Sequence, residues 1–204
     1  VSFQRFRKPN IEITPTISTI WSSDQCARIA ANSSSVTSFG TAAAASAPPP
    51  VLELAARTAR EWTDRPLVMI AGLAGRTDQA CREAQLALGH GYHAGLLSLA
   101  AMKGASTDEL IEHCASVARV IPLVGFYLQT AVGGVALPAG FWRRFASIDN
   151  VVAIKMAPFD RYRTLDVVRG VVAAGAEDRV TLYTGNDDHI VLDLLAPFDV
   201  RRGD

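Results

Sequence analysis

Five short apolar runs recur at a nearly constant spacing after residue 50, and this repeat limits the possible folds more than any other feature. The runs are Leu67–Ala71, Ala94–Leu99, Ile121–Tyr127, Val151–Ile154 and Val180–Tyr183. Their first residues follow one another at almost even intervals along the chain. Continuous apolar runs of this length are typical of strands buried on both faces, as in parallel sheets. Amphipathic stretches that predict helices lie around them, at 51–63, 106–119, 138–147 and 161–174.

Two α/β architectures accommodate such a repeat. A doubly wound sheet usually carries a Gly-x-Gly-x-x-Gly phosphate-binding turn, and this sequence has none. A (β/α)8 TIM barrel has eight units and about 250 residues, whereas this chain has 204. We therefore predict an incomplete (β/α)8 TIM barrel in which the five runs are strands 3–7, the first two strands are doubtful and the eighth is missing.

The composition changes near residue 50. Ser, Thr and Ala dominate before it, and the stretch 41–50 ends in Pro48-Pro49-Pro50. Proline is excluded from helix interiors and central strands, so 41–50 is expected to be a loop or linker. Ile11–Ile13 and Val36–Phe39 are candidate short strands. The predicted organisation is a poorly ordered N-terminal segment and linker at 1–50 and a partial TIM-barrel catalytic domain at 51–204.

Charge and cysteine content narrow the functional classes. The formal net charge is zero, whereas nucleic-acid binders normally carry a basic balance or patch. No apolar run reaches the roughly 20 residues that span a bilayer. The cysteines Cys26, Cys81 and Cys114 form no Cys-x-x-Cys pair, which argues against a disulfide framework or zinc site and favours a reducing compartment. We expect a cytoplasmic protein with no nucleic-acid or membrane partner and no metal.

Lys155 is the leading candidate for chemistry. It is one of only three lysines, with Lys8 and Lys103, and it ends an apolar run. Active sites of such barrels lie at the carboxyl ends of the strands, where desolvation lowers the pKa of an amine. A neutral amine attacks a ketone to form an imine. The alternative is that Lys155 points outward or pairs with a carboxylate.

Tyr127 and a turn after the last run complete the candidate site. Tyr127 ends the preceding run, so its hydroxyl is expected to face the same cavity as the Lys155 amine and to relay protons there. Gly185, Asn186 and Asp187 follow the last run. Asp187 and His189 could also ligate a divalent metal, although neighbouring side chains diverge and a helix start is the simpler interpretation.

The runs that end in Tyr127 and Lys155, and the turn at Gly185–Asp187, resemble the dihydrodipicolinate synthase/N-acetylneuraminate lyase family. The interval from Tyr127 to Lys155 matches that family without a gap, and the similarity extends over roughly 51–198. The resemblance implies a Schiff-base lyase or class I aldolase in which Lys155 binds pyruvate or a related 2-keto acid and Tyr127 relays protons. Gly185, Asn186 and Asp187 would line the far end of the substrate. It also implies no cofactor and a homo-oligomer, a tetramer or a dimer.

Several positions depart from the family pattern. The Gly-Thr-Thr-Gly-Glu segment that holds the keto acid's carboxylate has only a faint echo in Phe39-Gly40-Thr41. Ala100-Ala101-Met102 stands in place of a tyrosine-bearing loop, and Val132 stands where synthases carry a substrate-binding arginine. A typical dihydrodipicolinate synthase is therefore not expected. The alternatives are a non-catalytic truncated member or binding module, and a metal-dependent barrel enzyme.

Overall fold

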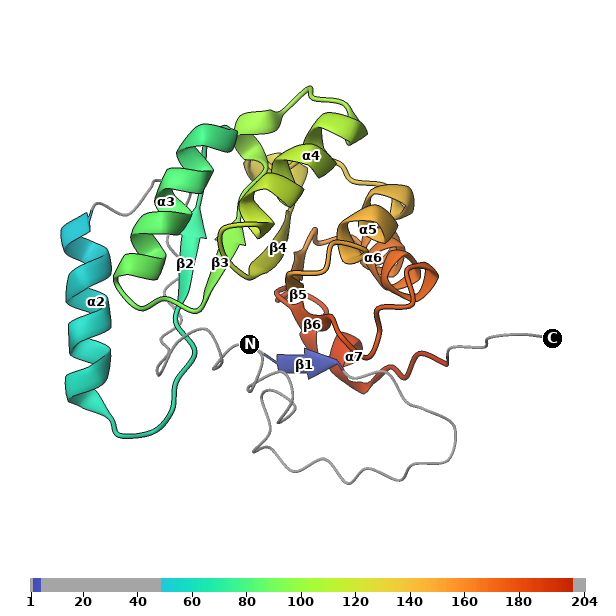
Figure 1. The fold of residues 1–204 in the computed structure, drawn as a ribbon. Coiled ribbons are helices and arrows are strands. Elements are labelled where there is room, and N and C mark those ends of the chain that lie inside the picture. Colours follow the sequence, from blue (N-terminus) through green and yellow to red (C-terminus); the bar gives the residue numbers. More distant parts are fainter. Residues whose placement is uncertain (1, 5–48, 200–204) are drawn as a thin grey trace.

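The computed structural model describes residues 2–4 and 49–199, and these form one six-stranded sheet with helices around it (Figure 1). The strand order is β1-β6-β5-β4-β3-β2. Strands β2 to β6 are parallel and adjacent in sequence order, as predicted for consecutive strands of a barrel, so that prediction is confirmed. Their bounds are Ile70–Leu73 (β2), Ala94–Leu97 (β3), Leu123–Leu128 (β4), Val151–Ala157 (β5) and Thr181–Thr184 (β6).

Strand β2 begins later than the apolar run that predicted it. The N–H of Met69 donates to the imidazole Nδ1 of His93 (2.8 Å). His93 is buried and sits directly before β3. A side chain thus takes the hydrogen bond that a neighbouring strand would otherwise accept, and pairing with β3 starts at Ile70.

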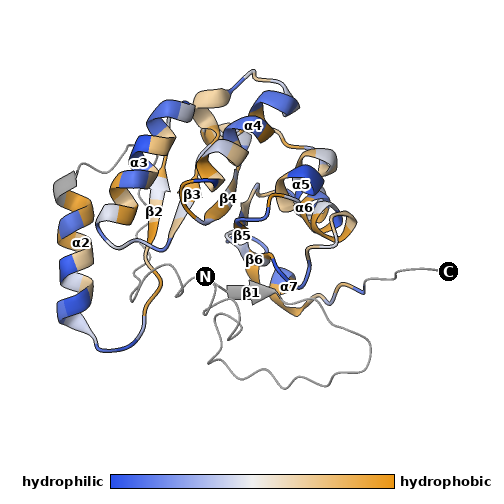
Figure 2. Ribbon diagram, viewed as in Figure 1, coloured by the Kyte–Doolittle hydropathy of each residue, from blue (hydrophilic) through white to orange (hydrophobic). Residues whose placement is uncertain are grey.

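Helices α3 to α6 follow the strands around the outside of the sheet (Figure 1). In Figure 2 hydrophobic and hydrophilic residues alternate along α2, α3 and α5, the pattern of amphipathic helices. No helix among the described residues is long and apolar enough to cross a membrane. The bounds are Pro49–Trp62 (α2), Thr77–Gly89 (α3), Thr107–Ala118 (α4), Ala139–Ala146 (α5), Arg161–Ala173 (α6) and Ile190–Leu195 (α7), with 3-10 turns at Ala100–Met102 and Thr130–Val132.

Helix α3 was not among the helices expected from the sequence. Its buried face is made of Ala80, Ala84 and Ala87, and alanine gives little hydropathy contrast with the polar face. The capping box predicted for α4 is present, since the Ser106 side chain accepts from the Glu109 N–H and the Glu109 carboxylate accepts from the Ser106 N–H.

The N-terminal boundary differs from the prediction. Helix α2 already begins at Pro49, because a proline in the first helical turn loses no intrahelical hydrogen bond. Residues 49 and 50 therefore belong to the helix and not to the predicted linker. The rest of the 41–50 linker and the candidate strands at 11–13 and 36–39 lie outside the described residues. The strand β1 (Ser2–Gln4), which was not foreseen, pairs antiparallel with β6.

The sheet buries two distinct apolar faces. The larger core lies between the strands and the helices, and includes Trp142, Phe145, Ile154 and Leu182. On the opposite face, called the helix-free face because its described buried residues come from no helix, the buried hydrophobic residues come from the strands: Ala94, Val124, Ala153 and Tyr183. Since successive side chains of a strand point to opposite faces, the position of a residue along its strand decides which of these environments it meets.

Replacing Asp160 is expected to weaken the start of α6 and the loop after β5. The Asp160 carboxylate accepts hydrogen bonds from the N–H groups of Tyr162 (2.9 Å) and Arg163 (3.2 Å). Asp160→Ala should lower the free energy of unfolding by about 1 kcal/mol, measured by urea denaturation. Asp160→Ser, which retains a capping oxygen, should lose much less, and equal losses in the two variants would contradict the capping role.

Candidate active site

Lys155 lies on β5 with its side chain on the helix-free face of the sheet. Its register partners are Phe126 on β4 and Tyr183 on β6, so these three side chains share one face. The Lys155 ammonium nitrogen lies 5.1 Å from the centre of the Phe126 ring. Burial lowers the pKa of Lys155 below the ordinary lysine value, and the negative charge of Asp187 opposes part of that shift. The structure thus places an amine with a lowered pKa near the carboxyl end of a central strand.

Gly185 makes room for the lysine side chain. It directly follows β6, and its N–H donates to the Met156 carbonyl (2.6 Å). A Cβ atom at Gly185 would lie 3.2 Å from the Lys155 Cε and 3.3 Å from the Ala157 Cβ, closer than relaxed carbon–carbon contacts of about 3.5–4.0 Å. Gly185 therefore lies against the Lys155 side chain, and its role at the far end of a substrate stays a prediction.

Tyr127 and Lys155 are not brought together, which differs from the expectation that they face one cavity. The Tyr127 side chain is buried on the helix side of the sheet, where its ring packs against Trp142 (centroids 5.0 Å apart). Its hydroxyl donates to the Leu137 carbonyl (3.2 Å) and accepts from the Leu137 N–H (3.3 Å). Burial is the main cause that raises its pKa. This hydroxyl holds the segment before α5 in place.

Strand alternation explains the difference. The residue opposite Lys155 in the β4–β5 register is Phe126, and Tyr127 pairs with Met156. The interval between Tyr127 and Lys155 in the sequence cannot reveal this, because the register shifts between Leu123 and Val124 and a shift of one position exchanges the two faces. An aromatic ring without a hydroxyl therefore occupies the place next to the amine that the sequence had assigned to a phenol.

Tyr127→Phe is expected to affect stability rather than reactivity at Lys155. The substitution keeps the ring against Trp142 but leaves the Leu137 N–H and carbonyl without their buried partner. The free energy of unfolding should fall by about 1–3 kcal/mol, measured by urea denaturation. Covalent capture of a keto acid by Lys155 should proceed at the wild-type rate, and a large drop in that rate at unchanged stability would instead assign Tyr127 to the chemistry.

Asn186 is occupied by structural hydrogen bonds. Its side chain is buried, its Oδ1 accepts from the Phe159 N–H (3.0 Å), and its Nδ2 donates to Thr164 Oγ1 (3.0 Å) and Asp193 Oδ2 (2.9 Å). Both polar ends thus serve the protein itself. Asp187, by contrast, is exposed and acts electrostatically on Lys155. Of the turn residues predicted to bind substrate, Gly185 lies against the lysine side chain, Asp187 acts on its charge, and Asn186 fixes the turn.

The buried carboxylate of Asp193 was missed by the sequence reasoning. It accepts from Arg161 Nη1 (2.5 Å) and from Thr184 Oγ1 (2.7 Å) in addition to Asn186. A signal existed, because Asp193 interrupts the otherwise apolar helix α7. A carboxylate in such a run is rarely buried without partners, so its presence predicts a polar network beneath α7.

The metal-site alternative finds no support in the described part of the chain. His189 Nδ1 lies 2.9 Å from an Asp188 oxygen, as expected for neighbours in a turn. No group of three or more His, Cys, Asp or Glu side chains with metal-binding geometry occurs within residues 51–199. Of the departures noted in the sequence, Ala100–Met102 forms a 3-10 turn after β3, and Val132 is exposed.

Comparisons of the sequence with protein-family models and with curated proteins found no match. Comparison of the structure with solved structures found three instructive similarities. A monomeric variant of dihydrodipicolinate synthase has 18% identity, covers 85% of this chain and has a TM-score of 0.63. The chloride-inhibited dihydrodipicolinate synthase from Acinetobacter baumannii in complex with pyruvate has 21% identity, covers 76% of this chain and has a TM-score of 0.61. The dihydrodipicolinate synthase from Thermotoga maritima has 19% identity, covers 72% of this chain and has a TM-score of 0.59.

The described residues have the fold of part of a (β/α)8 barrel, with a lysine on the helix-free face of the fourth parallel strand. More particularly, it is the fold of the dihydrodipicolinate synthase structures, as the sequence resemblance implied. The chain spans 63%, 53% and 52% of the length of these three structures. At such low identity the similarity establishes the fold alone.

Proposed function

We propose that this chain forms a Schiff base between Lys155 and a 2-keto acid, as the first step of a lyase or aldolase reaction. The observation that carries the proposal is the position of Lys155. Its amine lies on the helix-free face near the carboxyl end of β5, and burial lowers its pKa. An amine with a lowered pKa has a larger neutral fraction at neutral pH, and only the neutral form is a nucleophile.

The proposed reaction places each neighbouring group in a role. The Lys155 nitrogen attacks the ketone carbon, the carbonyl oxygen takes up protons and leaves as water, and an imine remains. Among the described titratable side chains, Tyr183 shares the face of Lys155 and Asp187 acts on it electrostatically. These two groups are better placed to exchange protons with the reacting nitrogen and oxygen than Tyr127, and Gly185 leaves the lysine room to turn toward the substrate.

The substrate class follows from the chemistry and from the fold. Pyruvate is bound in one of the structures that share this fold, and an amine nucleophile requires a carbonyl substrate. We therefore propose pyruvate or a close 2-keto acid as the first substrate. The homo-oligomer stays a prediction, and one of the similar structures is described as a monomeric variant.

The test is reductive trapping. The full chain is incubated with pyruvate and borohydride, digested, and examined by peptide mass spectrometry, with Lys103 as an exposed internal reference. A stable adduct confined to the Lys155 peptide is the expected result. An adduct spread over all lysines, or no adduct at all, would contradict the proposal and favour a non-catalytic member of this fold.

A further inference from the structure

A buried polar cluster lies directly behind the turn that borders Lys155. Its centre is Asp193, whose side chain is 1% exposed. One carboxylate oxygen accepts from Arg161, and the other accepts from Thr184 and Asn186. Apart from Arg161, which is half-buried, these partners are buried as well. The cluster therefore joins α7, the start of α6 and the end of β6 through one carboxylate.

The cluster also holds the loop that follows β5. Asn186 accepts from the Phe159 N–H (3.0 Å) and donates to Thr164 (3.0 Å). Phe159 has a φ of +52° and is the one described non-glycine residue with a positive φ. Such a conformation costs free energy in an L-residue and persists where surrounding contacts fix it. Two loops at the carboxyl ends of β5 and β6 are thereby tied to each other.

The net contribution of this buried ion pair to stability is expected to be small. Burying a carboxylate and its cationic partner contributes little net stability compared with apolar packing, because desolvation offsets the attraction. The hydrogen bonds of the cluster do, however, join the segments that carry its members. One of these segments is Thr184 to Asn186, which contains Gly185, in contact with the Lys155 side chain, and leads directly into Asp187.

We propose that Asp193 is a positioning residue of the Lys155 site. Through Thr184 and Asn186 it holds the turn so that Gly185 gives the lysine room and the Asp187 carboxylate stays within electrostatic reach of the amine. Asp193 touches no substrate in this proposal. The inference rests on the proposed function, since it concerns the same lysine.

The experiment measures the protonation of the Lys155 amine without any substrate. Its outcome is therefore independent of that of the borohydride trapping test. The pH dependence of acetylation of Lys155 by acetic anhydride is measured by peptide mass spectrometry, relative to the exposed Lys103. Among the described residues, the titratable groups around Lys155 are Asp187 and Tyr183, and Arg161 faces Asp193. Asp187→Asn removes the charge that opposes the lowered pKa of Lys155, so it should move the labelling midpoint to lower pH.

The decisive comparison repeats Asp187→Asn in the Asp193→Asn background. If Asp193 holds the turn, the Asp187 carboxylate no longer keeps its place within electrostatic reach of the amine in that background. The shift caused by Asp187→Asn should then be lost. An undiminished shift would overturn the proposal, and so would the absence of a shift in the otherwise wild-type chain. A merely structural role would lower the thermal midpoint and leave this coupling intact.

Matched variants cover the case that Asp193→Asn fails to fold. Thr184→Val removes the hydroxyl that donates to Asp193 while keeping the shape, whereas Thr184→Ser keeps the hydroxyl. The shift should be lost in the Val background and retained in the Ser background, and equal behaviour of the two would count against Asp193. Asp108→Asn, which breaks an exposed ion pair with Arg144 on the far helices, serves as a control that leaves the shift intact.

Discussion

Replacing Lys155 with alanine is expected to abolish covalent capture of pyruvate. In the proposed reaction the imine forms on the ε-nitrogen of this residue, so no adduct should be recoverable from its peptide after borohydride treatment. Lys155→Arg should be equally inert, because a guanidinium keeps the positive charge but stays protonated and forms no imine. Lys103→Ala removes an exposed lysine that is distant from Lys155 in the sequence. It should leave the yield of adduct unchanged. Adduct retained in Lys155→Arg would contradict the assignment.

The pH dependence of the same reaction follows from the environment of Lys155. Burial lowers the pKa of the amine, and Asp187 offsets part of this effect. The rate of capture should therefore fall as the pH drops through the lowered pKa, because protonation removes the nucleophile. Capture at Lys155 should therefore persist to lower pH than an amine with the ordinary lysine pKa would allow. A profile that matches an ordinary exposed lysine would show that the amine is solvated.

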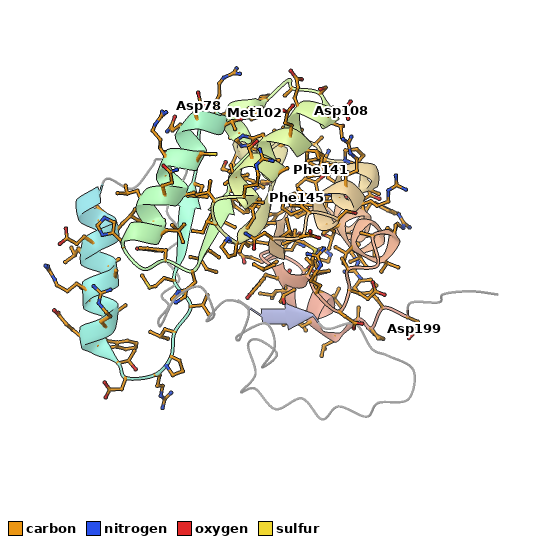
Figure 3. All side chains as sticks on the ribbon, viewed as in Figure 1. Asp78, Met102, Asp108, Phe141, Phe145 and Asp199 are labelled. Atoms are coloured by element: carbon orange, nitrogen blue, oxygen red, sulfur yellow. The ribbon has the colours of Figure 1, made fainter. Side chains whose placement is uncertain are left out.

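Phe145→Ala should lower the free energy of unfolding more than the substitutions of Asp160, Tyr127 and Trp62. Phe145 is 2% exposed on α5 and packs against Phe141 and Trp142, with ring centroids 5.8 Å and 5.7 Å away. Phe141 and Phe145 are labelled in Figure 3, one helical turn apart. Gly125 on β4 leaves the space into which the Phe145 ring fits, since a Cβ there would lie 2.7 Å from it. The cavity should cost about 3–5 kcal/mol of the free energy of unfolding.

The matched control is Trp62→Ala at the end of α2. Trp62 is equally aromatic but 80% exposed, so its removal should change the free energy of unfolding by about 0.5 kcal/mol or less. Both values come from urea denaturation followed by far-ultraviolet circular dichroism. Similar losses in the two variants would mean that α5 does not pack on the sheet as described. Folded Phe145→Ala protein should still be labelled at Lys155, because the two side chains lie on opposite faces of the sheet.

The order of the strands and the location of the lysine could be predicted because both depend on local pattern. Apolar runs repeated at nearly even intervals allow few arrangements other than parallel strands joined by helices. The position of Lys155 at the end of one run then places it at the edge where such folds gather their chemistry. Capping at Ser106 could likewise be predicted, since the whole box lies between Ser106 and Glu109.

The partners of the lysine depended on tertiary structure. A register shift between β4 and β5 decides that Phe126, and not Tyr127, faces Lys155, and registers are set by contacts between segments distant in the sequence. The Asp193 cluster joins residues from α6, β6 and α7, so no local pattern predicts its members. The sequence by itself determined the strand order and the position of Lys155 at the end of a strand, through hydrophobic periodicity. Only the tertiary structure decided which side chains surround that amine, because the two faces of a strand differ by a single position of register.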